Sequence, residues 1–388
     1  MDDPAPASIP PSAGTPRRWL ILSAAVLPLV IYVVLAARLW SFSIDDAAIS
    51  FRYARHLAAG QGLSWNPGGA PVEGYSNFLW VLIHAAFGRI GFGIEIAAKI
   101  TGVVCGSVSL LLLSLLCRRL WSSVRYWWLP AVLVSLTSTW VAWSVSGLET
   151  PMMGIFLLVS AMALSDPSRN RALLLSLGLG GMILTRPEGL VFAAIILLIA
   201  LARDRVQPWK NRVGALRYPL LVVLGVTGAL TVLRLLYYGT LFPNTVTAKF
   251  SFALPGWSHA VQWVLFGVPF WVVWVLAGSE LRRTAHWLLF VTSAALVVCQ
   301  VLISTTVVPV MNFLHRYQVA LLPLVVLPVP SALDRLDRLR PRLGILFAVF
   351  LVLWSLQDWH VVRERQAAED YLRRGRHCIA EHLVTLPD

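Results

Sequence analysis

Two adjacent carboxylates, Asp45 and Asp46, directly follow the first long apolar segment of the sequence. Ionised carboxylates are costly near hydrocarbon and are seldom kept there without a use. One of the two can accept a proton from an attacking hydroxyl while the other holds that acceptor or the substrate. A structural reading competes: Ser43 and Asp46 form a capping-box-like pattern, and both acids complement the dipole of a helix that Gly60 closes. Because the polar loops described next accompany these two aspartates, we favour a general-base role for one of them.

Further polar residues gather in turns between apolar runs, where Gly, Pro and Asn make poor helix interiors. In the first of these loops, Trp65 and Tyr75 offer flat faces for a sugar ring or a lipid headgroup, although both also suit an ordinary interfacial belt. Glu149 and Glu188 lie beside prolines at helix starts, and for Glu149 a structural capping role is favoured. The candidate substrate-binding residues are Trp65, Glu73, Tyr75, Asn77, Glu149, Glu188, Tyr238, Asn244 and His315.

Three cations fall among the same polar turns: Arg186, Lys249 and Arg316. A guanidinium suits a phosphate through its bidentate geometry, and a phosphate-linked lipid needs positive charge at headgroup level. The alternatives are a structural Arg186–Glu188 pair and a snorkelling anchor at Lys249. We expect these cations to bind an anionic phosphate.

The composition sets the class of protein that must position these residues. Of 388 residues, 57% are hydrophobic and 13% are charged, whereas a soluble domain has about a quarter charged residues. The net charge of +13 comes from short basic clusters between apolar runs, which indicates membrane topology and not a nucleic-acid surface. The four cysteines and the histidines show no disulfide framework and no metal spacing. Without a Gly-rich phosphate loop or a dinucleotide fingerprint, use of ATP or a nucleotide sugar at the cytoplasmic face is unsupported.

The apolar runs predict an all-α polytopic membrane protein with about eleven spanning helices, since a span needs roughly 20 residues. The predicted spans are 19–39, 95–117, 127–144, 151–165, 172–185, 188–202, 216–236, 260–278, 285–304, 317–330 and 342–358. Segment 76–92 is interpreted as an amphipathic or re-entrant helix at the outer surface. The predicted organisation is a disordered cytoplasmic N-terminus at 1–18, a transmembrane domain at 19–358 with a first outer loop at 40–94, and a short outer tail at 359–388.

The basic clusters give an orientation. Placing Arg17 and Arg18 in the cytoplasm puts nearly every dense basic cluster on the inner side of the membrane. The polar motifs then all fall on the other side. We therefore expect a multi-pass protein of the cytoplasmic membrane whose site faces outside.

An ordered series of motifs carries a family resemblance. It consists of DDAAISFRYAR at 45–55, GxGL at 60–63, NPG at 66–68, VEGYSNFLW at 72–80, SGLET at 146–150, TRPEG at 185–189 and YGTLFPNT at 238–245. This series resembles a subgroup of the GT-C glycosyltransferases, the mycobacterial cell-wall arabinofuranosyltransferases of the AftB type and their bacterial homologues.

The resemblance implies a GT-C-like bundle that transfers a sugar from a polyprenyl-phosphate donor to a cell-envelope glycan, lipid or protein. The general base of the first outer loop would be Asp45 or Asp46, and Arg186, Lys249 or Arg316 would hold the lipid phosphate. Membrane lipids are the other expected partners, and nucleic acid is not one. Some GT-C branches use a divalent metal, and nothing in this sequence requires one.

Two departures from the AftB pattern leave arabinose open as the sugar, with mannose as another choice. AftB-type enzymes carry a large soluble C-terminal domain, whereas this sequence ends after a short tail, and residues 307–312 replace their Gly-Gly-Asp-like segment. Two alternatives to an enzyme also stay open. A lipid-linked sugar flippase or other transporter would place polar residues along several helices, yet 190–202 is wholly apolar. A non-catalytic subunit with the same fold would not need both aspartates.

Overall fold

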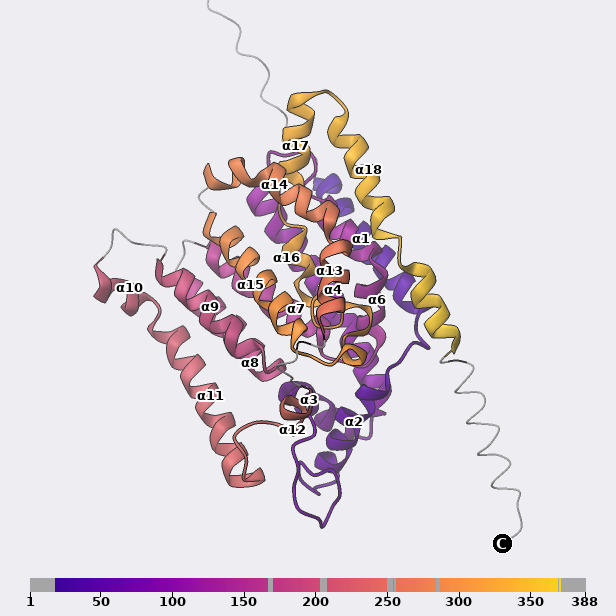
Figure 1. Cartoon of the computed structure of the whole chain (residues 1–388), viewed down its shortest axis with the longest axis vertical. Helices are drawn as coiled ribbons and strands as arrows, with labels where there is room; N and C mark the ends of the chain where they lie inside the picture. The colour runs from indigo at the N-terminus through magenta and orange to yellow at the C-terminus, as the bar shows by residue number, and fades with distance from the viewer. Residues whose placement is uncertain are drawn as a thin grey trace, which may run out of the picture.

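The computed structural model is a bundle of helices, drawn in Figure 1, and it describes residues 18–166, 170–202, 208–249, 254, 256–283, 287–368 and 370. The expected N-terminal segment 1–17 and most of the tail, 369 and 371–388, lie outside the described residues. The all-α fold class is confirmed. The first part of the bundle comprises α1 (Arg18–Arg38), α2 (Asp45–Ala58), α3 (Phe78–Arg89), α4 (Ile94–Trp121), α5 (Leu129–Leu136) and α6 (Ser138–Val145).

The remaining helices continue the bundle. The middle of the chain forms α7 (Thr150–Ser165), α8 (Arg171–Thr185), α9 (Gly189–Ala202), α10 (Trp209–Ala215), α11 (Arg217–Tyr238) and α12 (Asn244–Lys249). The last part forms α13 (Trp257–Phe266), α14 (Val268–Arg283), α15 (Trp287–Thr305), the 3-10 segments η1 (Pro309–His315) and η2 (Val319–Leu321), α16 (Leu322–Val325), α17 (Val329–Leu339) and α18 (Leu343–Ser355). Each predicted apolar run contains helix, although 127–144, 260–278 and 317–330 are each interrupted, and segment 76–92 contains the short helix α3.

The protein is a multi-pass membrane protein. Within the described ranges, four helical stretches are long and apolar enough to cross a membrane, and seven qualify if three sharply bent pairs each count as one span. Four shorter apolar helices of 10–17 residues accompany them. The predicted span at 127–144 is broken into α5 and α6 at Thr137, because the backbone there is extended. The total of eleven spans therefore stays a prediction.

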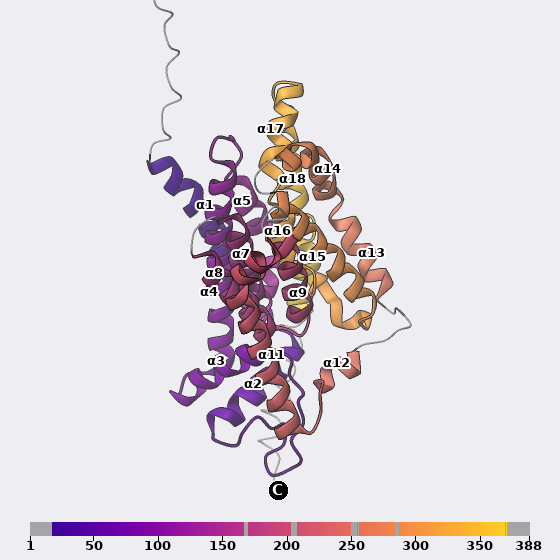
Figure 2. The same cartoon turned by 90° about the vertical axis from the view of Figure 1, so that its left-hand side faces the viewer.

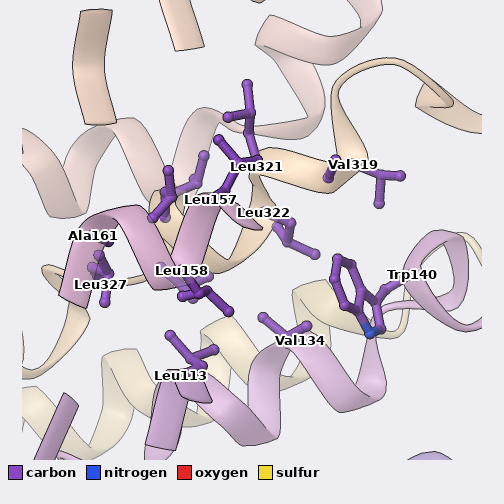
Figure 3. Close-up of a cluster of buried hydrophobic side chains, with 14 of the residues drawn as sticks. Leu113, Val134, Trp140, Leu157, Leu158, Ala161, Val319, Leu321, Leu322 and Leu327 are labelled. Carbon is purple, nitrogen blue, oxygen red and sulfur yellow. The ribbon is translucent and has the colours of Figure 1, made fainter. Parts of the chain in front are cut away.

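The core lies where α4, α5, α6 and α7 meet the η2–α16 segment. Figure 3 shows Leu113 of α4, Val134 of α5 and Trp140 of α6 gathered near Leu157 of α7 and Leu322 of α16. All eight residues of α6 are buried. Interdigitated side chains at interior packing density resist displacement, so this core is a rigid support for the loops that leave it.

The two ends of the bundle carry different kinds of residues. Helices α2, α3 and α12 lie together at one end, the lower end of Figures 1 and 2, while α17 and its turn into α18 lie at the opposite end. The first end carries the motif residues that follow α1 and α11. The other end carries the basic residues Arg335 and Arg338 of α17. This separation is the one that the positive-inside argument predicts, although which end faces the cytoplasm stays a prediction.

Candidate active site

The two adjacent aspartates have different surroundings. Asp46 has a side chain 19% exposed and forms an ion pair with Arg316, 270 residues further along the chain. Asp45 is exposed, and its Oδ1 accepts a hydrogen bond of 3.0 Å from the backbone N–H of Asp46. Successive side chains on a helix point about 100° apart, so the pair is divided between the interior and the surface.

Helix α2 starts differently from the capping-box prediction and ends as predicted. Its N-cap residue is Ile44, and no side chain makes the cap hydrogen bond, so the prediction of a cap at Ser43 is wrong. At the other end Gly60 has a φ of +75° and donates to Leu57 O, and Gln61 donates to His56 O at 2.9 Å. These two bonds form a Schellman motif. The helix therefore presents Asp46 to the bundle in a defined orientation.

A strained turn positions Arg316. Leu314 and His315 both have positive φ, +47° and +55°, a conformation that side chains other than Gly seldom adopt without support. The support comes from Trp143, whose Nε1 donates to Leu314 O at 2.8 Å, and from Trp263, whose ring lies 5.4 Å from that of His315. His315 lines neither of the cavities described below. It therefore contributes to the turn that carries Arg316.

Arg186 occupies the break between α8 and α9. The residue before a proline is biased away from the helical region, and Arg186, which precedes Pro187, has an extended backbone at φ −152° and ψ 148°. Gly189 makes the tight return possible, because a Cβ there would lie 2.1 Å from Met182 O. The side chain of Arg186 is 4% exposed, and its Nε lies 2.9 Å from Glu188 and 3.5 Å from Glu149. The structural pair considered at the sequence level is present, and a second carboxylate joins it.

Glu149 connects this arginine to the first loop. Its other oxygen accepts a hydrogen bond of 2.7 Å from Asn77 Nδ2, and Asn77 also exchanges hydrogen bonds with Ser50 of α2. Gly147, at φ +88°, allows the turn before α7, since a Cβ there would lie 2.7 Å from the ring of Phe51. Asn77 and Glu149 therefore lie in one buried network.

Two cavities meet at this network. The larger has a volume of about 230 Å³, and the smaller, of about 20 Å³, reaches Asp46. The residues common to both are Ser76, Glu149, Thr245 and Arg316. The larger one is further lined by Arg186, Pro187, Glu188, Tyr317, Thr306 and the apolar residues Val191, Val246, Ile303 and Val307. The site thus combines a polar end at Asp46 with an apolar wall.

The guanidinium groups of Arg186 and Arg316 can still donate hydrogen bonds to a ligand in these cavities. Arg186 lies 5.0 Å from the ring centroid of Tyr317, and Arg316 lies 5.7 Å from the same ring. Arg186 Nη1, Arg316 Nε and Thr245 Oγ1 are buried and have no hydrogen-bond partner in the described part of the chain. Buried polar groups are nearly always paired, so unpaired donors at a cavity indicate a place for an acceptor. A phosphate oxygen is such an acceptor.

Four other predicted residues form a second group, of which Tyr75 also lines the smaller cavity with Asp46 and Arg316. Arg234 Nε of α11 donates to both oxygens of Glu73, at 3.1 and 3.0 Å. The hydroxyls of Tyr75 and Tyr238 are 3.2 Å apart, and Tyr238 also donates to Leu63 O. The backbone N–H of Asn244 donates to Glu73 O. We call this group, Glu73, Tyr75, Arg234, Tyr238 and Asn244, the loop latch, because it fastens the first loop to α11 and α12.

The last two predicted residues have separate positions. Trp65 lies in the first loop, where the guanidinium of Arg52 sits 4.4 Å from its ring and donates to its carbonyl at 2.8 Å. Trp65 does not line either cavity. Lys249 ends α12, and its side chain is outside the described part of the chain. The geometry gives no support for substrate contact by Trp65, and the role of Lys249 stays a prediction.

Sequence reasoning missed several residues that line the site, among them Ser50, Ser76, Thr245 and Tyr317. Ser76 and Thr245 belong to motifs singled out in the sequence, and Tyr317 follows Arg316. Hydroxyl side chains give no pattern of their own, so their position beside predicted residues was the only signal. No group of three or more His, Cys, Asp or Glu in the described residues is arranged to hold a metal ion.

Comparisons with known proteins address the fold. The sequence matches no protein-family model and no curated protein. The crystal structure of ArnT from Cupriavidus metallidurans bound to undecaprenyl phosphate matches with a TM-score of 0.60 at 12% identity, over 92% of this chain and 72% of that chain. The Archaeoglobus fulgidus oligosaccharyltransferase, tethered with an acceptor peptide containing the NVT sequon, matches with a TM-score of 0.51 at 11% identity, over 91% of this chain and 55% of that chain.

Both of these proteins are GT-C glycosyltransferases. The fold is that of the GT-C glycosyltransferases. At these identities the likeness establishes the fold and leaves residue roles to the geometry. The narrower resemblance to AftB-type enzymes rests on the motifs alone.

Proposed function

We propose that the protein is a glycosyltransferase that moves a sugar from a polyprenyl-phosphate donor to a hydroxyl-bearing glycan, lipid or protein of the cell envelope. The observation that carries this proposal is a pair of adjoining cavities that share Arg316: Asp46 is paired with Arg316 in the smaller one, Arg186 lines the larger one, and Arg186 and Arg316 both keep unpaired N–H groups. Such a transfer needs a carboxylate that accepts the proton of the acceptor hydroxyl and cations that bind the phosphate of the sugar donor. The GT-C fold, shared with ArnT bound to undecaprenyl phosphate, supports the same class of donor.

The donor phosphate would bind between Arg186 and Arg316. Both guanidinium groups are close to the ring of Tyr317, and Thr245 adds a hydroxyl to the same space. The apolar wall of Val191, Val246 and Ile303 suits the first isoprene units next to the phosphate, since burying that hydrocarbon is favourable. The Arg side chains would then stabilise the phosphate as it leaves the sugar.

Asp46 would act as the general base. The acceptor oxygen forms a bond to the anomeric carbon, the bond from that carbon to the phosphate oxygen breaks, and the acceptor proton goes to Asp46. In the structure Asp46 is bound to Arg316. When the donor phosphate takes part of the hydrogen bonding of that guanidinium, Asp46 becomes a stronger proton acceptor. Donor binding would thus prepare the base.

The proposal also covers the side of the membrane that the site faces and the identity of the transferred sugar. The separation of motif helices and basic helices at opposite ends supports an outward-facing site in the cytoplasmic membrane. The AftB-like motif series supports a pentofuranose such as arabinose, while hexose donors such as mannose are the alternative.

The test is a transfer assay in reconstituted membranes. Radiolabelled polyprenyl-phosphate arabinose and polyprenyl-phosphate mannose are offered separately, with an envelope extract as acceptor, to wild type, Asp46→Asn and Asp45→Asn. We expect Asp46→Asn to lower kcat by about 10²–10⁴-fold, the usual loss on removing a general base. The matched change Asp45→Asn, at an exposed position on the same helix, is expected to lower kcat by less than about tenfold.

Equal activity in wild type and Asp46→Asn would remove Asp46 from the mechanism. Movement of labelled lipid across the bilayer without transfer would favour the transporter alternative. Transfer from only one of the two donors identifies the sugar.

A further inference from the structure

Lys99 is a buried cation that the proposed reaction has not used. It lies in the second turn of α4 and is 4% exposed. Its Nζ donates to three backbone carbonyls from two segments of the chain: Trp40 O at 2.9 Å, Phe42 O at 2.6 Å and Val145 O at 3.1 Å. An ammonium has three N–H donors, so it can bind all three carbonyls at once. The arrangement is specific to a lysine.

One of the three carbonyls ends a helix, and the other two lie in the turn that follows α1. Trp40 and Phe42 follow the C-terminus of α1, and Val145 is the last residue of α6. The final carbonyls of a helix have no partner within the helix and carry partial negative charge, so a cation there satisfies them and complements the dipole. Lys99 therefore ties the ends of α1 and α6 to α4.

The same two segments carry the carboxylates of the site. Asp46 follows Phe42 by four residues, and Glu149 follows Val145 by four residues. By holding both segments, Lys99 affects the distance between Asp46 and Glu149, which line the same small cavity.

The face of α4 that carries Lys99 is fitted closely to α6. A Cβ at Gly102 would lie 2.1 Å from Ser144 O, and a Cβ at Gly106 would lie 2.0 Å from the hydroxyl of Tyr32 on α1. Residues three and seven places beyond Lys99 lie on the same face of the helix. Close backbone approach at the glycines brings the end of α6 within reach of the ammonium.

We propose that Lys99 is a positioning residue that sets the placement of Asp46 and Glu149 across the cavity. This inference rests on the proposed function, in which those carboxylates face the donor and acceptor. Catalysis is sensitive to such placement, because a displacement of about 1 Å at the reacting groups can cost about 10²-fold in rate. Lys99 itself does not line the cavity and touches no reacting atom.

The experiment uses the full chain with Lys99→Met, which keeps the length of the side chain and removes its charge and donors. The control is Lys210→Met, at an exposed position on α10. The first readout is hydrogen exchange by mass spectrometry, which does not need activity. We expect Lys99→Met, and not Lys210→Met, to speed exchange in both 39–46 and 143–149 while α9 is unchanged, since a lost anchor lowers the local opening free energy.

The second readout is the transfer assay. We expect kcat of Lys99→Met to fall about 10²-fold because the base is displaced from its reacting position, and we expect a much smaller change in the donor KM because Lys99 donates to neither phosphate-binding arginine. In the Asp46→Asn background the further loss should be much smaller, since residues that act through one group are not additive. A loss confined to KM, or full additivity, would overturn a positioning role.

The two proposals fail separately. If wild type transfers no sugar, the proposed function is wrong, and the exchange readout still decides whether Lys99 anchors both segments. If exchange in both segments is unchanged by Lys99→Met, the anchoring is wrong whatever the activity. Should Lys99→Met fail to accumulate, Lys99→Gln, which is neutral and has two N–H donors, is expected to give intermediate exchange. Exchange in Lys99→Gln equal to wild type would overturn the proposal.

Discussion

Two arginine–carboxylate groups lie at the same end of the bundle and differ in what they leave unsatisfied. In the loop latch, the Nε of Arg234 binds both oxygens of Glu73, and neither residue lines a cavity. In the active-site group, Arg186 and Arg316 are also paired with carboxylates, yet each keeps a buried N–H without a partner beside a cavity. The latch is complete as it stands, whereas the active-site group can still accept a ligand.

The difference shows which signal separates a structural ion pair from a binding site. Both groups bury a charged pair, and burial alone is weak evidence for either role. A binding site is distinguished from a structural ion pair by a buried N–H group that has no partner and lies beside a cavity. Three kinds of change test the contrast.

The largest expected effect is on donor affinity. Arg316→Gln and Arg186→Gln each remove a charged donor at the cavity, and a hydrogen bond to a charged group contributes about 1.5–3 kcal/mol. The dissociation constant for undecaprenyl phosphate, measured with the purified protein in detergent, should therefore rise about 10–100-fold. Arg234→Gln in the latch is the matched control, expected to change it by less than about threefold. If all three variants weakened the binding of undecaprenyl phosphate equally, the loop latch and the active-site group would not differ in ligand binding.

An intermediate effect is expected on stability. Glu73→Gln replaces one of the two oxygens that accept from Arg234 Nε with an NH₂ group, so that two donors face each other, and this should lower the free energy of unfolding by about 1–3 kcal/mol. The melting temperature reports this loss, and kcat at saturating donor should stay within about twofold of wild type. Glu280→Gln, in an exposed pair with Arg338 at 3.5 Å, should change stability by no more than about 0.5 kcal/mol. A Glu73→Gln variant with full stability and lost kcat would move Glu73 into the catalytic site.

The smallest expected effect is a pH dependence of stability. Burial raises the pKa of Glu73 above its ordinary value, and the hydrogen bond and charge of Arg234 oppose that shift only in part. The folded state then holds the Glu73 proton more tightly than the unfolded state, so this contribution to stability is fully present below the ordinary pKa and is lost as pH rises through the raised one. Melting temperatures from about pH 4 to pH 7 should decline slightly across that window in wild type, and the decline should be absent in Glu73→Gln. An identical slope in both proteins would contradict the assignment.

Much of the fold was predictable because apolar runs in a membrane leave the backbone little choice but a helix. The break between α5 and α6 was not, since the extended backbone at Thr137 interrupts an otherwise continuous apolar run. The split between Asp45 and Asp46 follows from helix geometry, whereas the pairing of Asp46 with Arg316 spans 270 residues and has no local signal. Glu73 and Glu149 looked equivalent as motif acids, and only their partners, Arg234 in one case and Asn77 with Arg186 in the other, separate them.

The burial of α6 has a consequence for biogenesis. With eight residues each, α5 and α6 are about 12 Å long and cannot individually cross a hydrocarbon layer about 30 Å thick. Since α6 has every residue buried and contacts α1, α4, α5, α7 and η2, its environment is made by neighbours that are synthesised both before and after it. The turn that carries Glu149 therefore takes its place only once the late segments have returned to the bundle.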